Sequence, residues 1–190
     1  DELEAYAAKG YEAVVEELLH PERSPEFEED LIQRYYDGWE SARLAAGVWI
    51  YRMVNTERPL EEKIALFWHQ VFATGNGKLD NCCDLLVQIE MFREQGMGNY
   101  RDLLVGLAKN PAMIFWLDNK DNHKDAVNEN YGREILELFS MGVGNYVEED
   151  VKGATRAFTG WTFKTNIPGK IYPSQFVYVE DEHGSESKVG

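Results

Sequence analysis

The sequence is poor in basic residues, and this shortage limits its partners. It has 19 Lys and Arg against 34 Asp and Glu in 190 residues, a net charge of −15. Because phosphate groups are bound by Lys and Arg surfaces, nucleic acid is not expected as a partner. Residues 1–30 hold eleven acidic and two basic residues. This predicts a solvated acidic surface, with a face for a divalent cation such as calcium or for a cationic partner as the alternative.

Long hydrophobic runs and paired cysteines are also lacking. The longest apolar run covers residues 44–51 and ends at Arg52, well short of the roughly 20 residues that a membrane span requires. We therefore expect no transmembrane segment in this sequence. Cys82 and Cys83 are adjacent, which strains a disulfide, and they have no C-x-x-C spacing. They are interpreted as two thiols buried at the start of a helix.

Several enzyme signatures are missing as well. The sequence has no G-x-S-x-G, no P-loop, no H-E-x-x-H and no G-x-G-x-x-G after a strand. Residues 118–125, D-N-K-D-N-H-K-D, suggest a calcium loop only superficially, because Lys120 stands at the third position and His123 at the sixth, where glycine is required. The sequence identifies no particular cofactor, so the cofactor stays unknown.

The patterns that are present favour helices. Apolar periodicity, together with the Pro and Gly residues that break helices, predicts helices over residues 2–9, 11–19, 27–55 and 81–95. The helix over 27–55 is expected to be started by Ser24-Pro25-Glu26. Further helices are predicted to start at Pro59, Asn99 and Pro111. Trp161–Phe163 and Phe176–Val179 alternate like strands around a Pro168–Gly169 turn. We predict a mainly α fold, an irregular orthogonal multi-helix bundle with a small β hairpin or extended segment near its end. Residues 1–160 are expected to form the helical domain, and 161–190 an extended segment of the same domain leading to an absent C-terminal half.

The most informative stretch is residues 128–144, N-E-N-Y-G-R-E-I-L-E-L-F-S-M-G-V-G. At 100° per residue, a single helix places its polar side chains on one side and an apolar wall on the other. The polar side carries Glu129, Asn130, Arg133, Glu134 and Glu137, and the spacing lets Glu129 and Glu137 share Arg133. The wall carries Tyr131, Ile135, Leu138 and Phe139, and Gly142 and Gly144 end the helix.

This stretch resembles the signature of a bacterial family known as domain of unknown function 1800. The resemblance extends through Tyr146, Glu148, Asp150-Val151 and Thr159-Gly160-Trp161. The resemblance implies no particular reaction. Members of the family are longer than this sequence, so we expect sequence to be missing at both ends. The resemblance also implies export to the periplasm or cell surface. Two positions depart from the family pattern: Val71 stands where a second histidine is frequent, and Val147 where Ser or Thr caps a helix.

Candidate site residues come from the polar side of this helix. A solvated ladder of charges is the simpler interpretation, but the resemblance favours an internal polar network, mostly structural. If the network is catalytic, Glu134, Glu137, Arg133 and Asn130 are the candidates. If it holds a metal, His69, Glu134 and His183 are the candidate ligands, as in bundles where Glu and His meet on facing helices. A lone His69 among aromatic residues is more often a core residue.

Two functions follow from these observations. The first is a non-enzymatic binding or structural subunit of an exported bacterial protein assembly, with other protein subunits as partners. The alternative is a metal-assisted or carboxylate-dependent hydrolase that uses Glu134, Glu137 and His69.

Overall fold

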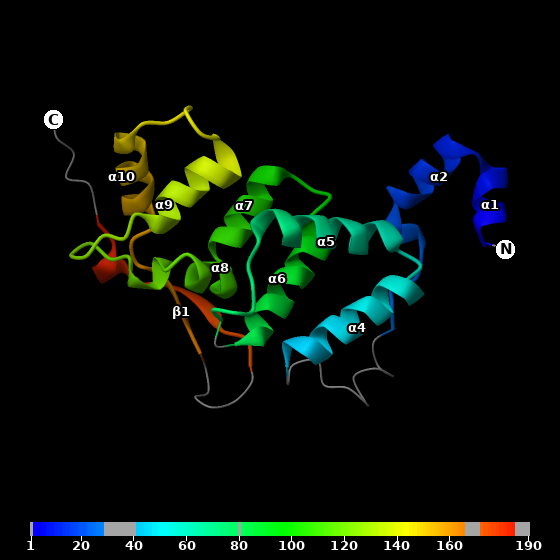
Figure 1. Ribbon diagram of the computed structural model, residues 1–190, viewed down its shortest axis with the longest axis horizontal. Coiled ribbons are helices and arrows are strands. Elements are labelled where there is room, and N and C mark those ends of the chain that lie inside the picture. The colour runs from blue at the N-terminus through cyan, green and yellow to red at the C-terminus, as the bar shows by residue number, and fades with distance from the viewer. Residues whose placement is uncertain (1, 29–40, 80, 166–171, 185–190) are drawn as a thin grey trace.

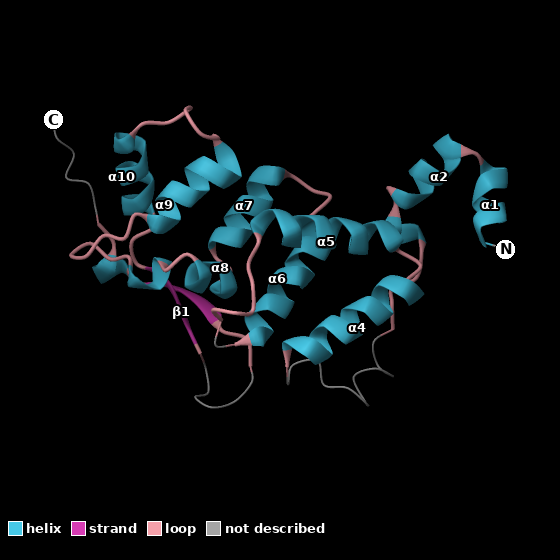
Figure 2. Cartoon of the chain, in the orientation of Figure 1, coloured by secondary structure: helices cyan, strands magenta, loops and turns pink. Residues whose placement is uncertain are grey.

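The computed structural model describes residues 2–28, 41–79, 81–165 and 172–184, and it is mainly helical (Figures 1 and 2). This confirms the predicted fold class of helices with a small β hairpin. The division at residue 160 stays a prediction. The elements are α1 (Glu2–Lys9), α2 (Tyr11–Leu18), η1 (Pro21–Arg23), α4 (Ala42–Asn55), α5 (Pro59–Phe72), α6 (Cys82–Gln95), α7 (Tyr100–Ala108), α8 (Pro111–Trp116), η2 (Asn119–Asp121), α9 (Asn130–Glu134), η3 (Ile135–Ser140), α10 (Glu148–Ala157), β1 (Trp161–Lys164), β2 (Gln175–Tyr178) and η4 (Glu180–Glu182).

Local sequence explains most helix starts. The side chains of Asn81, Asn99 and Asn110 each accept a backbone N–H of the helix that follows, and Ser41 does the same for α4. Such caps satisfy amides that have no partner within the helix. Gly10 takes a φ of 83° between α1 and α2, so the predicted break is confirmed.

The predicted helix start at Pro25 is wrong. Residues 25–28 are not helical, and α4 begins after Ser41; the part of the prediction covering residues 29–40 lies outside the described residues. Ser24 is extended, and this stretch makes tertiary contacts. Arg58 donates from Nε and Nη2 to the Ser24 carbonyl at 2.9 and 2.7 Å, and the Phe27 ring lies 6.1 Å from that of Tyr51.

The core lies where α5, α6, α7 and α8 meet, and aromatic rings fill its centre. The Phe72 ring lies 5.5 Å from those of Trp68 and Phe92 and 5.2 Å from that of Phe139. Phe67 and Val71, although apolar, are exposed. They lie on the outer face of the helix, because Ala65, Trp68 and Phe72 face the core.

The hairpin packs beside α8 and η2 (Figure 2). β1 and β2 are antiparallel, with Trp161 opposite Tyr178 and Phe163 opposite Phe176. The predicted turn at Pro168–Gly169 lies outside the described residues. Buried Asp84 ties the hairpin to α6, since its carboxylate accepts the Ser174 N–H at 2.7 Å and hydroxyl at 2.9 Å.

Candidate functional site

The central stretch is helical, but it is not one regular α-helix. α9 continues into η3 with π-type hydrogen bonding, as in the Met141 N–H to Leu136 carbonyl bond of 2.9 Å. A π turn has more residues than an α turn, so side chains after it rotate away from their expected direction. Tyr131 and Phe139 are buried as predicted, whereas Leu138 is exposed and does not join the apolar wall. Gly142 and Gly144 follow with φ of 80° and 85°, which confirms their role in ending the helix.

The asparagines of the N-E-N motif bind the loop that precedes them. The Asn130 side chain donates to the Leu117 carbonyl at 3.1 Å, and that of Asn128 donates to the Asp118 carbonyl at 3.3 Å. The Asn128 side-chain oxygen also accepts the Asn130 N–H at 3.0 Å. Asn130, a candidate catalytic residue, therefore has a structural partner that fixes the start of α9.

Two further asparagines, which sequence reasoning missed, extend these bonds into the interior. Asn119 donates to the carbonyls of Phe158 and Trp161, and Asn122 donates to the Thr155 carbonyl and the Asn119 side chain. Both are about 1–2% exposed. We call Asn119, Asn122, Asn128 and Asn130 the asparagine network. Its signal in the sequence is the N-x-x-N spacing of Asn119 and Asn122 inside the polar loop of residues 118–125.

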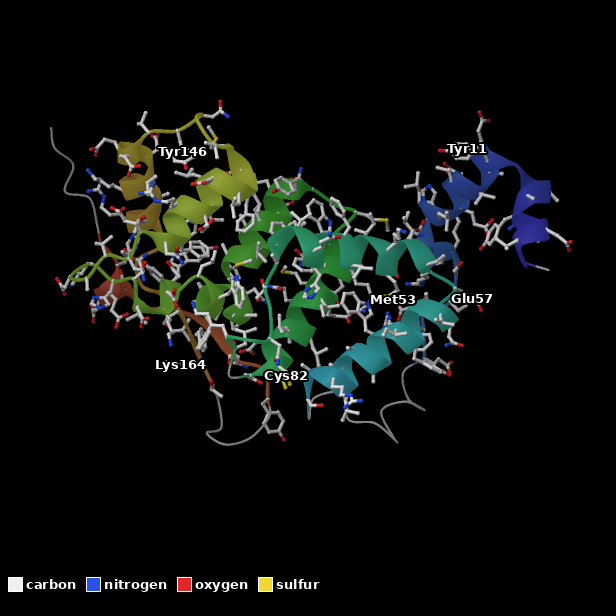
Figure 3. All side chains as sticks on the ribbon, in the orientation of Figure 1. Tyr11, Met53, Glu57, Cys82, Tyr146 and Lys164 are labelled. Atoms are coloured by element: carbon white, nitrogen blue, oxygen red, sulfur yellow. The ribbon has the colours of Figure 1, made fainter. Side chains whose placement is uncertain are left out.

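The charged half of the motif lies at the surface, where α9 meets the start of α10 (Figure 3). Arg133 donates to both Glu148 oxygens at 2.9 and 2.8 Å and to Glu129 at 3.4 Å. The side chains of Arg133, Glu129 and Glu148 are 36, 44 and 67% exposed, so these residues do not form the internal network that we expected. The hydrogen bonds and charge of Glu148 raise the pKa of Arg133.

The two candidate carboxylates have different surroundings. Glu137 accepts a hydrogen bond of 2.8 Å from the Tyr146 hydroxyl, rather than sharing Arg133 as the spacing predicted. This hydrogen bond and the carboxylate charge raise the pKa of Tyr146. Glu134 is half-buried and makes no hydrogen bond or ion pair within the described part of the chain.

The cap of α10 shows the effect of Val147. Asp150 still accepts the Val147 N–H at 2.9 Å, but the valine side chain has no atom with which to return a bond. Asn145 does not replace it, because its side chain donates to the carbonyls of Met141 and Gly142.

The candidate metal ligands are not brought together. His183 Nδ1 lies 2.9 Å from the Thr159 carbonyl oxygen, at the end of the hairpin. His69 is on α5, with its ring 5.6 Å from that of Trp49. Over residues 2–28, 41–79, 81–165 and 172–184, no three His, Cys, Asp or Glu side chains are grouped to hold a metal ion.

His69 has unusual surroundings of its own. Its Nδ1 is buried and has no hydrogen-bond partner, and burial lowers its pKa. A buried polar atom without a partner costs about 1–3 kcal/mol of stability. His69 also lines a cavity of about 200 Å³ between α4, α5 and α6.

A buried ion cluster, which sequence reasoning also missed, lies nearby. Glu62 on α5 accepts bonds of 2.6 Å from Arg52 of α4 and from Arg93 of α6, and one of 2.7 Å from the Trp49 indole N–H. Burial acts to raise the pKa of Glu62, but Arg93, Trp49 and Arg52 outweigh it, and the pKa falls below its usual value. These partners come from two other helices, α4 and α6, and stand 10 to 31 residues from Glu62, so no local pattern marks them.

Comparison with known proteins gives a family and no activity. None of the described helices is both long and apolar enough to cross a membrane. No curated protein and no solved structure matches the sequence. A family model matches residues 1–189, almost the whole sequence, so the chain belongs to the family described as Protein of unknown function (DUF1800).

Proposed function

We propose that the chain is a non-enzymatic binding or structural subunit of an exported bacterial protein assembly, and that α1 and α2 bind its partner. The observation that carries this proposal is the exposure of these two helices, which we call the acidic arm. α2 has no buried residue. Leu3, Tyr11 and Leu19 are 78, 84 and 54% exposed. The acidic arm projects from the body of the protein beyond α4 and α5 (Figures 1 and 3).

Short helices of this kind need a surface to pack against. α1 and α2 have eight residues each, and isolated helices shorter than roughly 12–15 residues are marginal in water. Within the described residues the acidic arm contacts chiefly itself and η1. Burial of Leu3, Tyr11 and Leu19 by another protein would supply the missing stabilisation.

The negative charge of the acidic arm favours a positively charged partner. α1 and α2 hold five acidic residues and one basic residue, Lys9, so a partner with a basic face around an apolar centre fits best. A second copy of this chain fits poorly, because two acidic arms would repel each other. Export is supported only by the family resemblance.

The hydrolase alternative has weaker support. Asn130, Arg133 and Glu137 each have a structural partner, and the described residues do not gather His69 with Glu134 and Glu137 in one metal-binding group. That alternative predicts turnover by the full-length protein that Glu134→Gln abolishes without unfolding it.

The test is purification of the full-length protein from its own cells at low and high salt. We expect a particle with a second protein in fixed stoichiometry at low salt, and its loss when Glu12→Lys and Glu16→Lys are combined. Glu149→Lys is the matched control, since Glu149 is exposed on α10, away from the acidic arm. A monomer at all salt concentrations, or equal loss with the control, would contradict the proposal.

A further inference from the structure

A cavity of about 200 Å³ lies between α4, α5 and α6, and its residues suit a ligand. Its walls are mostly apolar. The residues that line it are Ala42, Ala45, Ala46, Trp49, His69, Thr74, Gly75, Asn76, Cys82, Leu85, Leu86 and Ile89. Cys82 lies at the start of α6 (Figure 3). Ligand sites commonly combine such apolar walls with a few polar groups that fix orientation.

His69 supplies the polar group with the clearest unmet capacity. Its Nδ1 is enclosed without a partner. Its other ring nitrogen, Nε2, is not enclosed, and within the described residues Nε2 makes no hydrogen bond. An enclosed lone pair without a partner is less costly than an enclosed N–H, so we assign the proton of the neutral ring to Nε2. Because His69 lines the cavity and Nε2 is its nitrogen that is not enclosed, Nε2 is the atom that can donate a hydrogen bond to a molecule there.

The remaining lining residues define the charge and size of that molecule. Apart from His69, the described lining residues include no Asp, Glu, Lys or Arg, so an ion would lose its hydration without gaining a counter-charge. An apolar cavity of about 150 Å³ holds benzene. A cavity slightly larger than this has room for one ring with one substituent.

We propose that this cavity binds a small neutral single-ring compound whose one oxygen accepts a hydrogen bond from His69. The rings of Trp49 and His69 pack edge to face with centroids 5.6 Å apart, and both residues line the cavity. The site does not depend on the acidic arm, so it stands whether or not the proposed partner exists.

Phenol is the probe, and alkylation of Cys82 by iodoacetamide is the readout. Cys82 lines the cavity, whereas Cys83 is fully buried and serves as the internal reference. We expect saturating phenol to slow Cys82 alkylation, measured by mass spectrometry, and to raise the thermal midpoint of the wild-type protein.

Two variants test the position of the site. Ala46→Phe, on the wall of the cavity, should abolish both effects of phenol. Val54→Phe is the matched control, since it adds the same ring to an exposed position of α4 outside the cavity, and it should leave both effects intact. If Ala46→Phe fails to fold, Ala42→Phe fills the same cavity from the first turn of α4.

His69→Leu tests the hydrogen bond. It should weaken phenol binding about three- to tenfold, the usual effect of losing one hydrogen bond, and leave benzene binding almost unchanged. The site is wrong if phenol does not protect Cys82, or if the cavity-filling variants bind phenol like the wild type. Equal weakening of phenol and benzene by His69→Leu would overturn the role of His69.

Discussion

Individual buried polar residues connect the helices of this protein. Glu62 joins α4, α5 and α6 through Arg52, Trp49 and Arg93. A buried carboxylate between two guanidinium groups adds little stability over an apolar core, but removing it takes from Arg52 and Arg93 the carboxylate that they share. Its role is therefore revealed most clearly by substitution.

Glu62→Gln should destabilise the protein by about 3–5 kcal/mol, because Arg52 and Arg93 lose their shared counter-charge while side-chain size is kept. Urea denaturation measures the change in the free energy of unfolding. Glu61→Gln is the control: its carboxylate lies at the longer distance of 3.9 Å from Arg58, and we expect a much smaller loss. Equal losses in the two variants would show that the charge of Glu62 is not special.

His69 predicts a pH dependence. Burial lowers its pKa, so below the usual value of about 6.5 the unfolded chain binds a proton that the folded chain does not. The free energy of unfolding should therefore decrease as the pH falls from about 6.5 toward the lowered pKa. His69→Gln should reduce this slope. Denaturation at pH 7.5 and 5.5 tests this, and an identical pH dependence in both proteins would refute it.

At the scale of elements, the close approach of α9 and α10 depends on one glycine. A Cβ on Gly132 would lie 2.3 Å from Thr155 Oγ1 and 2.7 Å from its backbone nitrogen. Both are impossible distances, and Thr155 is fully buried. The two helices therefore pack only if position 132 has no side chain.

Gly132→Ala should destabilise the protein by about 1–3 kcal/mol, a typical result of overpacking. Gly153→Ala is the matched control, since a Cβ at that helical position meets no atom within 4 Å. It should be neutral or stabilise the protein by up to about 1 kcal/mol. Thermal unfolding of both variants decides the matter, and an unchanged midpoint for Gly132→Ala would contradict the packing.

Sequence reasoning succeeded for elements with local causes. The helices over 81–95, from Asn99 and from Pro111 begin close to where they were predicted, because the asparagine caps that start them need only their own neighbours. It failed at Pro25, where Arg58 binds the Ser24 carbonyl from a distance, and at Leu138, which is exposed within the π-type η3. It found the N-E-N motif, but not that its amides bind carbonyls, because those partners are set by the fold.

At the scale of the whole molecule, stability is unevenly distributed. The core lies among α5, α6, α7 and α8, while the acidic arm buries almost nothing. Regions with few buried contacts open at low free-energy cost. The acidic arm of the free protein should therefore unfold locally long before the body does.

Limited trypsin digestion tests this difference. The first cuts should follow Lys9 and Arg23, which are exposed at or near the acidic arm, while Arg93 is only 8% exposed and should be cut last. Mass spectrometry over time gives the order of cleavage. Early cleavage at Arg93, or resistance at Lys9 and Arg23 in the isolated protein, would contradict the uneven stability.

The asparagine network is also a place where deamidation would damage the protein. Deamidation of Asn119 or Asn122 would replace an N–H donor that faces backbone carbonyls with a carboxylate that repels them. The junction of α8, α10 and β1 would then be lost through spontaneous chemical decay, without any mutation. The burial of both side chains is thus a protection against slow hydrolysis as much as a source of order.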